Sequence, residues 1–215
     1  MAWLLHDPTA AKIMGVATAA FVLCEVGATF AGQAGERGRL PRSVAESILL
    51  VRRRDGAVTA DRGTKWIVAV AARVAILAAL VIAALVPRLR AGANDWPTFG
   101  VGIALILAGA ALRDWAIVTL GRFFRREVTI APEQQLVRRG PYRVLRHPSY
   151  TGLIVVCAGY GLAFGSWVGA AVALLAMVLG LLPRIRVEER ALAGKFGAEY
   201  ADYARSTARL VPGLW

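Results

Sequence analysis

Long apolar runs constrain this chain more than any other feature of its sequence. The runs at 66–86 and 99–112 are longer and more apolar than the core strands of a soluble domain. A helix needs roughly 20 consecutive apolar residues to cross the hydrocarbon core of a bilayer. Hydrophobic residues make up 57% of the 215 residues, whereas soluble domains carry about 45–50%. The sequence therefore predicts an all-α, polytopic membrane protein.

The apolar residues predict about five transmembrane helices. The first three are expected at 11–32, 66–86 and 99–120. The segment 151–183 carries no charge and, at 33 residues, is too long for a single crossing. Small residues interrupt it near its middle: Gly159, Gly161, Gly165 and Ser166. We therefore expect a helical hairpin with halves at 151–164 and 167–183.

The basic residues predict how these helices are oriented. Of the 26 Lys and Arg residues, eight lie in 33–65, seven in 119–150 and six in 184–215. Only two lie in 87–97, and the hairpin tip has none. Cytoplasmic loops carry the excess of Lys and Arg, so the N-terminus is expected outside and the C-terminus in the cytoplasm. The richness in Ala, Arg and Gly is typical of a bacterial GC-rich genome, and the membrane would then be the bacterial plasma membrane.

The net charge of +12 does not by itself indicate nucleic-acid binding, because the cations flank apolar runs instead of forming a soluble basic face. No nucleic-acid partner is therefore expected. The two His and two Cys residues lie too far apart for metal-ligand spacing, so no metal site is expected either. Ionisable residues inside spans are functional candidates by default. These are Glu25, Arg73, Arg113 and Asp114.

The C-terminal segment carries a helical stripe. Its members are Leu192, Phe196, Tyr200 and Tyr203, at spacings of four, four and three. This spacing predicts a cytoplasmic amphipathic helix within 185–203. Such a helix either lies on the lipid headgroups or forms the wall of a site at the membrane surface.

The densest polar cluster is at 136–152. Two turn signals, Gly140-Pro141 and His147-Pro148, fix its backbone, and its arginines directly precede an apolar span. A basic membrane anchor with interfacial tyrosines explains the arginines, but it does not need His147. A second cluster contains Glu188 and Glu189, which as helix neighbours point about 100° apart and cannot form a close dyad. It is either a solvated, ion-paired helix start or a place where one glutamate turns inward to meet a cation.

Two motifs resemble one known family. The run Leu136-Val137-x-x-Gly140-Pro141-Tyr142-x-x-x-Arg146-His147-Pro148-x-Tyr150-x-Gly152 resembles the signature of the isoprenylcysteine carboxyl methyltransferases. The run Glu188-Glu189-x-x-Leu192-x-x-x-Phe196-Gly197-x-x-Tyr200-x-x-Tyr203, followed by Arg209-Leu210-Val211-Pro212, is similar to the second motif of that family. The resemblance covers about residues 105–212. It divides the chain into N-terminal helices with a basic loop at 1–100 and a methyltransferase core with a cofactor pocket at 101–215.

The resemblance implies a membrane methyltransferase that uses S-adenosylmethionine and a lipophilic acceptor, which is an isoprenoid or another lipid, with a carboxylate as one candidate accepting group. The family's cofactor positions match Leu136, Val137, Tyr142, Arg146, His147, Tyr150, Leu153, Glu188 and Glu189. The catalytic candidates are Glu189, together with Arg186 or Arg190 as the partner of the acceptor's carboxylate. Two alternatives stay open: an NADPH-dependent membrane reductase of the sterol-reductase type, and a membrane protein without enzymatic activity.

The implied chemistry suits these residue types. The amino-acid end of the methyl donor is a zwitterion, so its carboxylate needs donors such as Arg146 and His147, and its ammonium needs a glutamate. Tyr142 or Tyr150 can supply an aromatic wall for the adenine. Methyl transfer depends mainly on positioning the two reactants in line. A carboxylate acceptor is already ionised at neutral pH, so no general base is needed.

Overall fold

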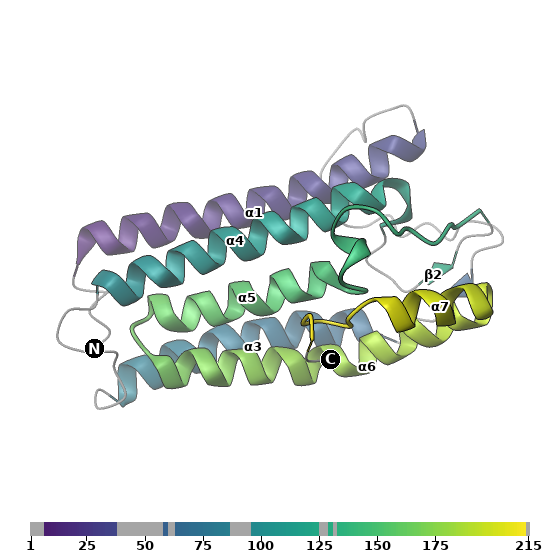
Figure 1. Cartoon of the computed structure of the whole chain (residues 1–215). Coiled ribbons are helices and arrows are strands. Elements are labelled where there is room, and N and C mark those ends of the chain that lie inside the picture. The colour runs from purple at the N-terminus through teal and green to yellow at the C-terminus, as the bar shows by residue number, and fades with distance from the viewer. Residues whose placement is uncertain are drawn as a thin grey trace.

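The chain folds into a bundle of long helices that run in alternating directions (Figure 1). The computed structural model describes residues 7–37, 58–59, 63–86, 96–124, 129–130 and 133–213. The long helices are α1 (Pro8–Arg37), α3 (Thr64–Leu85), α4 (Trp96–Leu120), α5 (Pro148–Ala163) and α6 (Trp167–Phe196). The shorter elements are η3 (Gly121–Phe123), η4 (Gly140–Arg143), α7 (Ala198–Ser206) and the strands β1 (Val58–Thr59) and β2 (Thr129–Ile130). The two strands pair antiparallel, with Val58 opposite Ile130.

The helix composition identifies an integral membrane protein. Within the described ranges, three segments are long and apolar enough to cross a bilayer: Trp66–Leu85, Trp96–Leu120 and Trp167–Phe196. Pro8–Leu23 and Pro148–Ala163 are apolar but shorter. The outer face of α3 exposes Val70, Val74, Leu77 and Val81. A row of exposed aliphatic side chains along a helix fits lipid as its surroundings.

Glycines bring α4 and α5 into close contact. A Cβ atom built on Gly109 would lie 2.6 Å from the carbonyl oxygen of Gly152, and one built on Gly159 would lie 2.8 Å from that of Gly102. The two glycines on each helix are seven residues apart, so they occupy one face. Small residues of this kind let membrane helices approach at backbone distance. This contact positions the N-terminus of α5, where His147 and Pro148 lie.

The expected hairpin forms, with one difference inside its first helix. Gly165 has a φ of 76°, and the Ser166 side chain accepts a hydrogen bond of 2.9 Å from the Gly169 N–H to cap α6. Gly159 and Gly161 do not break the helix as the sequence predicted; they lie inside α5 and pack against neighbouring helices. A helix interior tolerates glycine where close packing offsets its weak helix propensity.

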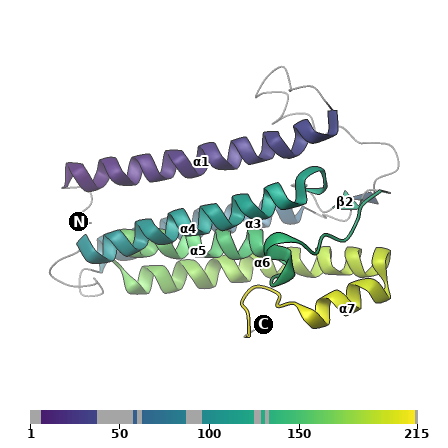
Figure 2. The same ribbon diagram turned by 45° about the horizontal axis from the view of Figure 1, so that its top comes forward.

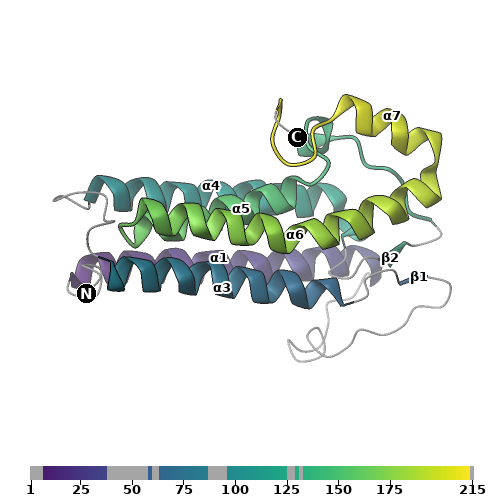
Figure 3. The same ribbon diagram turned by 90° about the horizontal axis from the view of Figure 1, so that it is seen from below.

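The sequence-based boundary at Pro183 is wrong. Helix α6 continues through Pro183 to Phe196, so the segment 185–203, for which the sequence predicted an amphipathic helix, is divided between α6 and α7. Inside a helix proline removes only one backbone hydrogen bond, and membrane helices tolerate it. The break comes instead at Gly197, with a φ of 52°, after which α7 turns back along α6 (Figure 3). Figure 2 shows that η4 and α7 lie toward the same end of the bundle.

Substituting Gly109 by alanine tests the α4–α5 contact. The added methyl group would collide with backbone atoms of α5, so we expect the free energy of unfolding to fall by about 1–3 kcal/mol. Gly100→Ala on the same helix is the control, because nothing lies within 4 Å of its Cβ position. Thermal unfolding of both purified variants in detergent measures the difference. Equal melting temperatures would show that the two helices do not depend on this approach.

Candidate functional site

A turn before α5 and the C-terminal segment run side by side and bring the two sequence motifs together. Leu145 and Ala208 form a parallel bridge. The backbone N–H groups of Arg146 and His147 donate to the carbonyls of Ala208 and Arg209, at 2.8 and 3.2 Å. These hydrogen bonds hold the His147 turn against a segment about 60 residues later in the chain.

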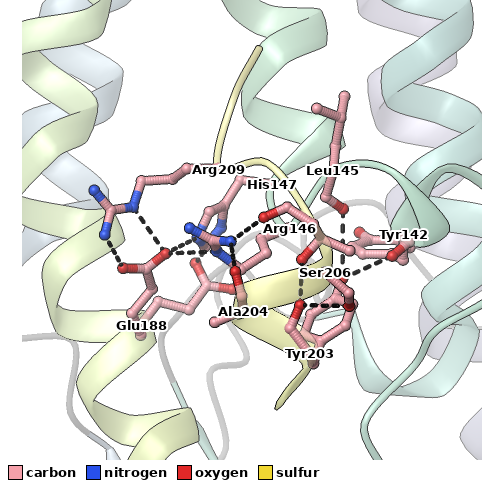
Figure 4. A network of polar contacts seen from close by, with 11 residues as sticks. Tyr142, Leu145, Arg146, His147, Glu188, Tyr203, Ala204, Ser206 and Arg209 are labelled. Carbon is pink, nitrogen blue, oxygen red and sulfur yellow. Dashed lines mark hydrogen bonds and ion pairs between the residues drawn. The ribbon is translucent and has the colours of Figure 1, made fainter. Parts of the chain in front are cut away.

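The carboxylate of Glu189 on α6 is the centre of a cluster of cations. Its Oε1 atom accepts hydrogen bonds from Arg146 Nε at 3.2 Å and from Arg209 Nε at 3.0 Å, and Arg209 also donates to Oε2 at 2.8 Å. His147 Nε2 lies 3.3 Å from the same Oε1. The Glu189 side chain is 16% exposed and that of His147 only 3%. Figure 4 shows Arg146 and His147 at the middle of this cluster, with Arg209 on one side and Tyr142 and Tyr203 on the other.

Glu188 makes a second set of contacts. The Tyr150 hydroxyl donates to Glu188 Oε2 at 2.6 Å, and Arg184 Nε donates to the Tyr150 hydroxyl at 2.7 Å. The rings of Tyr150 and His147 stack, with centroids 5.4 Å apart. His147 Nδ1 lies 3.9 Å from Glu188 Oε2. The imidazole is therefore held between the two glutamates.

Both glutamates thus face the cluster, although the sequence predicted that only one would turn inward. Their backbone positions do point in different directions, but the two long side chains reach partners on opposite sides of His147. The reading of this segment as a solvated helix start is wrong for Glu189. Glu188, at 32% exposed, is the more accessible of the two carboxylates.

The three arginines of α6 differ in exposure and contacts. Arg186 and Arg190 are exposed. Arg184 is buried and contacts Tyr150. The sequence contained an indication that Arg184 belongs to the site, because it precedes Glu188 by one helical turn. The sequence analysis did not predict Arg209 as a site residue, because its pairing with Glu189 depends on how the C-terminal segment folds back.

The remaining predicted site residues lie on neighbouring elements and are buried or half-buried. Leu136 and Val137 are half-buried in the extended segment before η4, and Leu153 packs against the core from α5. Tyr142 is buried and borders a shallow pocket of about 210 Å³. The pocket is lined by Arg138, Tyr142, Arg143, Tyr203, Ser206 and Thr207. Arg146 connects pocket and cluster, since it donates to the carbonyl of Thr207 and, at 2.7 Å, to that of Ala204.

The ionisable residues inside the predicted transmembrane helices make local contacts, as far as the structure describes them. Arg113 donates to the Ser149 hydroxyl at 2.6 Å and so ties α4 to the start of α5. Asp114 borders a cavity of about 160 Å³ between α1 and α4. Arg73 donates to the Ala69 carbonyl of its own helix. The side chain of Glu25 lies outside the described residues, as do residues 38–57 and 60–62 of the basic loop at 35–65.

Three buried tyrosines around the cluster stay protonated at neutral pH. Desolvation raises the pKa of Tyr203 to about 12, and it also raises the pKa values of Tyr142 and Tyr200. Their hydroxyls are therefore neutral donors. The Tyr203 hydroxyl donates to the carbonyl of Tyr142 at 2.9 Å, which fastens α7 to η4.

The arrangement suits a small zwitterion better than a metal ion. Guanidinium groups, an imidazole, two carboxylates and phenol hydroxyls meet at one end of the bundle. No group of three or more His, Cys, Asp or Glu residues that could hold a metal occurs in the part of the chain that the structure describes. A ligand with both an anionic and a cationic group would find partners for each.

The comparisons with known proteins agree on one family. A sequence model described as "Isoprenylcysteine carboxyl methyltransferase (ICMT) family" matches residues 102–194. A probable protein-S-isoprenylcysteine O-methyltransferase of Oryza sativa subsp. indica is 31% identical over 140 residues, which cover 64% of this chain and 72% of the rice protein. Protein-S-isoprenylcysteine O-methyltransferase A of Arabidopsis thaliana is 34% identical over 121 residues, or 55% of this chain. The chain spans 61% of the length of the Arabidopsis protein.

One solved structure has a similar fold. It is described as the eukaryotic intramembrane Ras methyltransferase ICMT without a monobody, and it aligns with a TM-score of 0.66. The alignment covers 99% of this chain and 70% of the other, at 23% sequence identity. The likeness shows that the helix arrangement is shared along nearly the whole chain.

Removing the Glu189 carboxylate tests its structural role. Glu189→Ala leaves two partly buried guanidinium groups without their anion, so we expect the free energy of unfolding to fall by about 2–4 kcal/mol, near the ~3–5 kcal/mol for breaking a buried ion pair. Glu199→Ala is the control, because Glu199 pairs with Arg138 at an exposed site and such pairs contribute about 0–1 kcal/mol. Chemical denaturation in detergent measures both variants. A loss no larger than that of the control would contradict the role assigned to Glu189.

Proposed function

Because the chain belongs to the isoprenylcysteine carboxyl methyltransferase family, we propose that it transfers a methyl group from S-adenosylmethionine to a lipophilic acceptor in the membrane. One observation carries the proposal. The His147 turn and the Glu188–Glu189 pair, 41 residues apart in sequence, meet within hydrogen-bonding distance at one end of the bundle. Neither the reductase nor the non-enzymatic alternative accounts for the family membership.

The cofactor would be held by the residues of this cluster. When bound, S-adenosylmethionine supplies a methyl group activated on a sulfonium. Glu188 is the accessible carboxylate for its ammonium, and Arg146 with His147 are the donors for its carboxylate. The wall for the adenine would come from Leu136, Val137, Tyr142, Tyr150 and Leu153. Glu189 orients Arg146 by accepting a hydrogen bond from its Nε, and its Oε1 lies 3.3 Å from His147 Nε2.

The acceptor is expected to be a lipid that approaches from the bilayer. The relatives named above are protein-S-isoprenylcysteine O-methyltransferases, which supports an isoprenyl group bearing a carboxylate. Such a carboxylate is ionised at neutral pH and needs no general base. Of the α6 arginines, Arg184 is the one inside the cluster, so we propose it as the partner of the acceptor's carboxylate in place of Arg186 or Arg190.

The membrane topology follows from the same reading. We propose five crossings by α1, α3, α4, α5 and α6, with the N-terminus outside and the C-terminus, α7 and the cluster in the cytoplasm of a bacterial cell. The alternating helix directions in Figure 1 support an odd number of crossings. Residues 101–215, which include the family match at 102–194, would form the methyltransferase core. A water-soluble cofactor then enters from the cytoplasm while the lipid enters laterally.

Calorimetric titration with S-adenosylhomocysteine tests the cofactor assignment. We expect the wild-type protein in nanodiscs to bind, and Glu188→Ala to weaken binding by about 10- to 100-fold, because one charge-assisted hydrogen bond contributes about 1.5–3 kcal/mol. His147→Ala is expected to weaken binding as well. Glu199→Ala, an exposed glutamate on α7, is the matched control and should bind normally. Absence of binding to the wild-type protein would contradict the proposed function.

Arginine substitutions test the acceptor site. Transfer of labelled methyl from S-adenosylmethionine to an S-isoprenylated cysteine derivative is the assay. We expect Arg184→Gln to raise the KM for the acceptor by about 10-fold or more through loss of a charged contact. Arg186→Gln and Arg190→Gln should leave that KM within about twofold, as exposed charges usually do. The reverse pattern would return the role to Arg186 or Arg190.

A further inference from the structure

The hydroxyl of Tyr200 is a buried polar group without a protein partner. The residue is 6% exposed, and its hydroxyl oxygen makes no hydrogen bond to any described residue. Leaving a buried donor unsatisfied costs free energy, so such groups in folded proteins nearly always have a partner, which can be a bound molecule.

Tyr200 lies beside the charged cluster. It stands one helical turn before Ala204 on α7, so both residues share a face of that helix. The Ala204 carbonyl accepts a hydrogen bond from Arg146, which in turn donates to Glu189. Arg146, a member of the cluster, therefore contacts α7 one turn from Tyr200, whose ring centroid lies 6.2 Å from that of Tyr203.

The electrostatic surroundings agree with this position. Burial is the main cause that raises the pKa of the Tyr200 hydroxyl, and the carboxylates of Glu189 and Glu188 raise it further. The guanidinium of Arg146 acts in the opposite direction. The hydroxyl is thus protonated at neutral pH and available as a donor.

A neighbouring tyrosine shows what a structural hydroxyl looks like on this helix. The Tyr203 hydroxyl, three residues later, donates to the carbonyls of Tyr142 and Leu145 at 2.9 and 3.4 Å. It fastens α7 to the η4 turn. The Tyr200 hydroxyl makes no equivalent contact to a described residue. It therefore does not attach α7 to another part of the structure.

We propose that Tyr200 is a ligand-binding residue whose hydroxyl donates a hydrogen bond to the carboxylate of the methyl donor's amino-acid end. This inference rests on the proposed function, and it extends the binding site from α5 and α6 onto α7. The reason is complementarity: a neutral donor near the guanidinium of Arg146 adds to a set of groups that favours an anionic oxygen.

Two ligands and two variants test the proposal. S-adenosylhomocysteine has the amino-acid end, whereas 5′-methylthioadenosine keeps the nucleoside and lacks that end. We expect Tyr200→Phe to weaken binding of S-adenosylhomocysteine by about 10-fold or more, as for loss of a hydrogen bond to a charged group. Its affinity for 5′-methylthioadenosine, measured by competition, should equal that of the wild type.

Tyr203→Phe is the matched control for folding. It removes two hydrogen bonds, so we expect its melting temperature to fall, while that of Tyr200→Phe stays at or above the wild-type value. Unchanged S-adenosylhomocysteine affinity in Tyr200→Phe would overturn the inference, and so would an equal loss for both ligands. Failure of the wild-type protein to bind either ligand would instead overturn the proposed function.

Discussion

The carboxylate of Glu189 joins three parts of the chain: helix α6, the turn before α5 and the C-terminal segment. It accepts from Arg146 and lies beside His147 in the turn before α5, and it accepts from Arg209 in the C-terminal segment. Because Glu189 itself belongs to α6, these contacts join the hairpin to the tail. A carboxylate that neutralises two partly buried guanidinium groups is costly to remove, so we expect the arrangement of the site to depend on this side chain.

The position of that carboxylate depends in turn on helix packing in the apolar part of the molecule. Glycines on α4 and α5 allow backbone contact and set where the turn before α5 begins. Ser166 and Gly165 reverse the chain at the other end of the hairpin. Helix α6 then carries Arg184, Glu188 and Glu189 past the end of α5. The charged site is therefore a consequence of how closely apolar helices can approach.

The sequence predicted the positions of the long apolar helices well because the length of an apolar run is a local property of the sequence. It failed at Pro183, where local propensity indicated a break and the helix continued. It did not predict that Arg184 is the buried arginine of α6, since exposure is decided by how α6 rotates against its neighbours. Arg209 and the unpartnered hydroxyl of Tyr200 depend on the return of the tail, which no spacing in the sequence encodes. The motifs identified His147, Glu188 and Glu189 because each of these residues lies within a short stretch of sequence with a characteristic spacing.

The most direct test of the account is a structure determined in lipid nanodiscs at saturating S-adenosylhomocysteine. The account predicts ligand density against His147 and Glu188 on one side and α7 on the other, with the C-terminal segment still beside the turn. Ligand density elsewhere in the bundle, or a cluster that stays closed by its own ion pairs with no ligand against it, would contradict it.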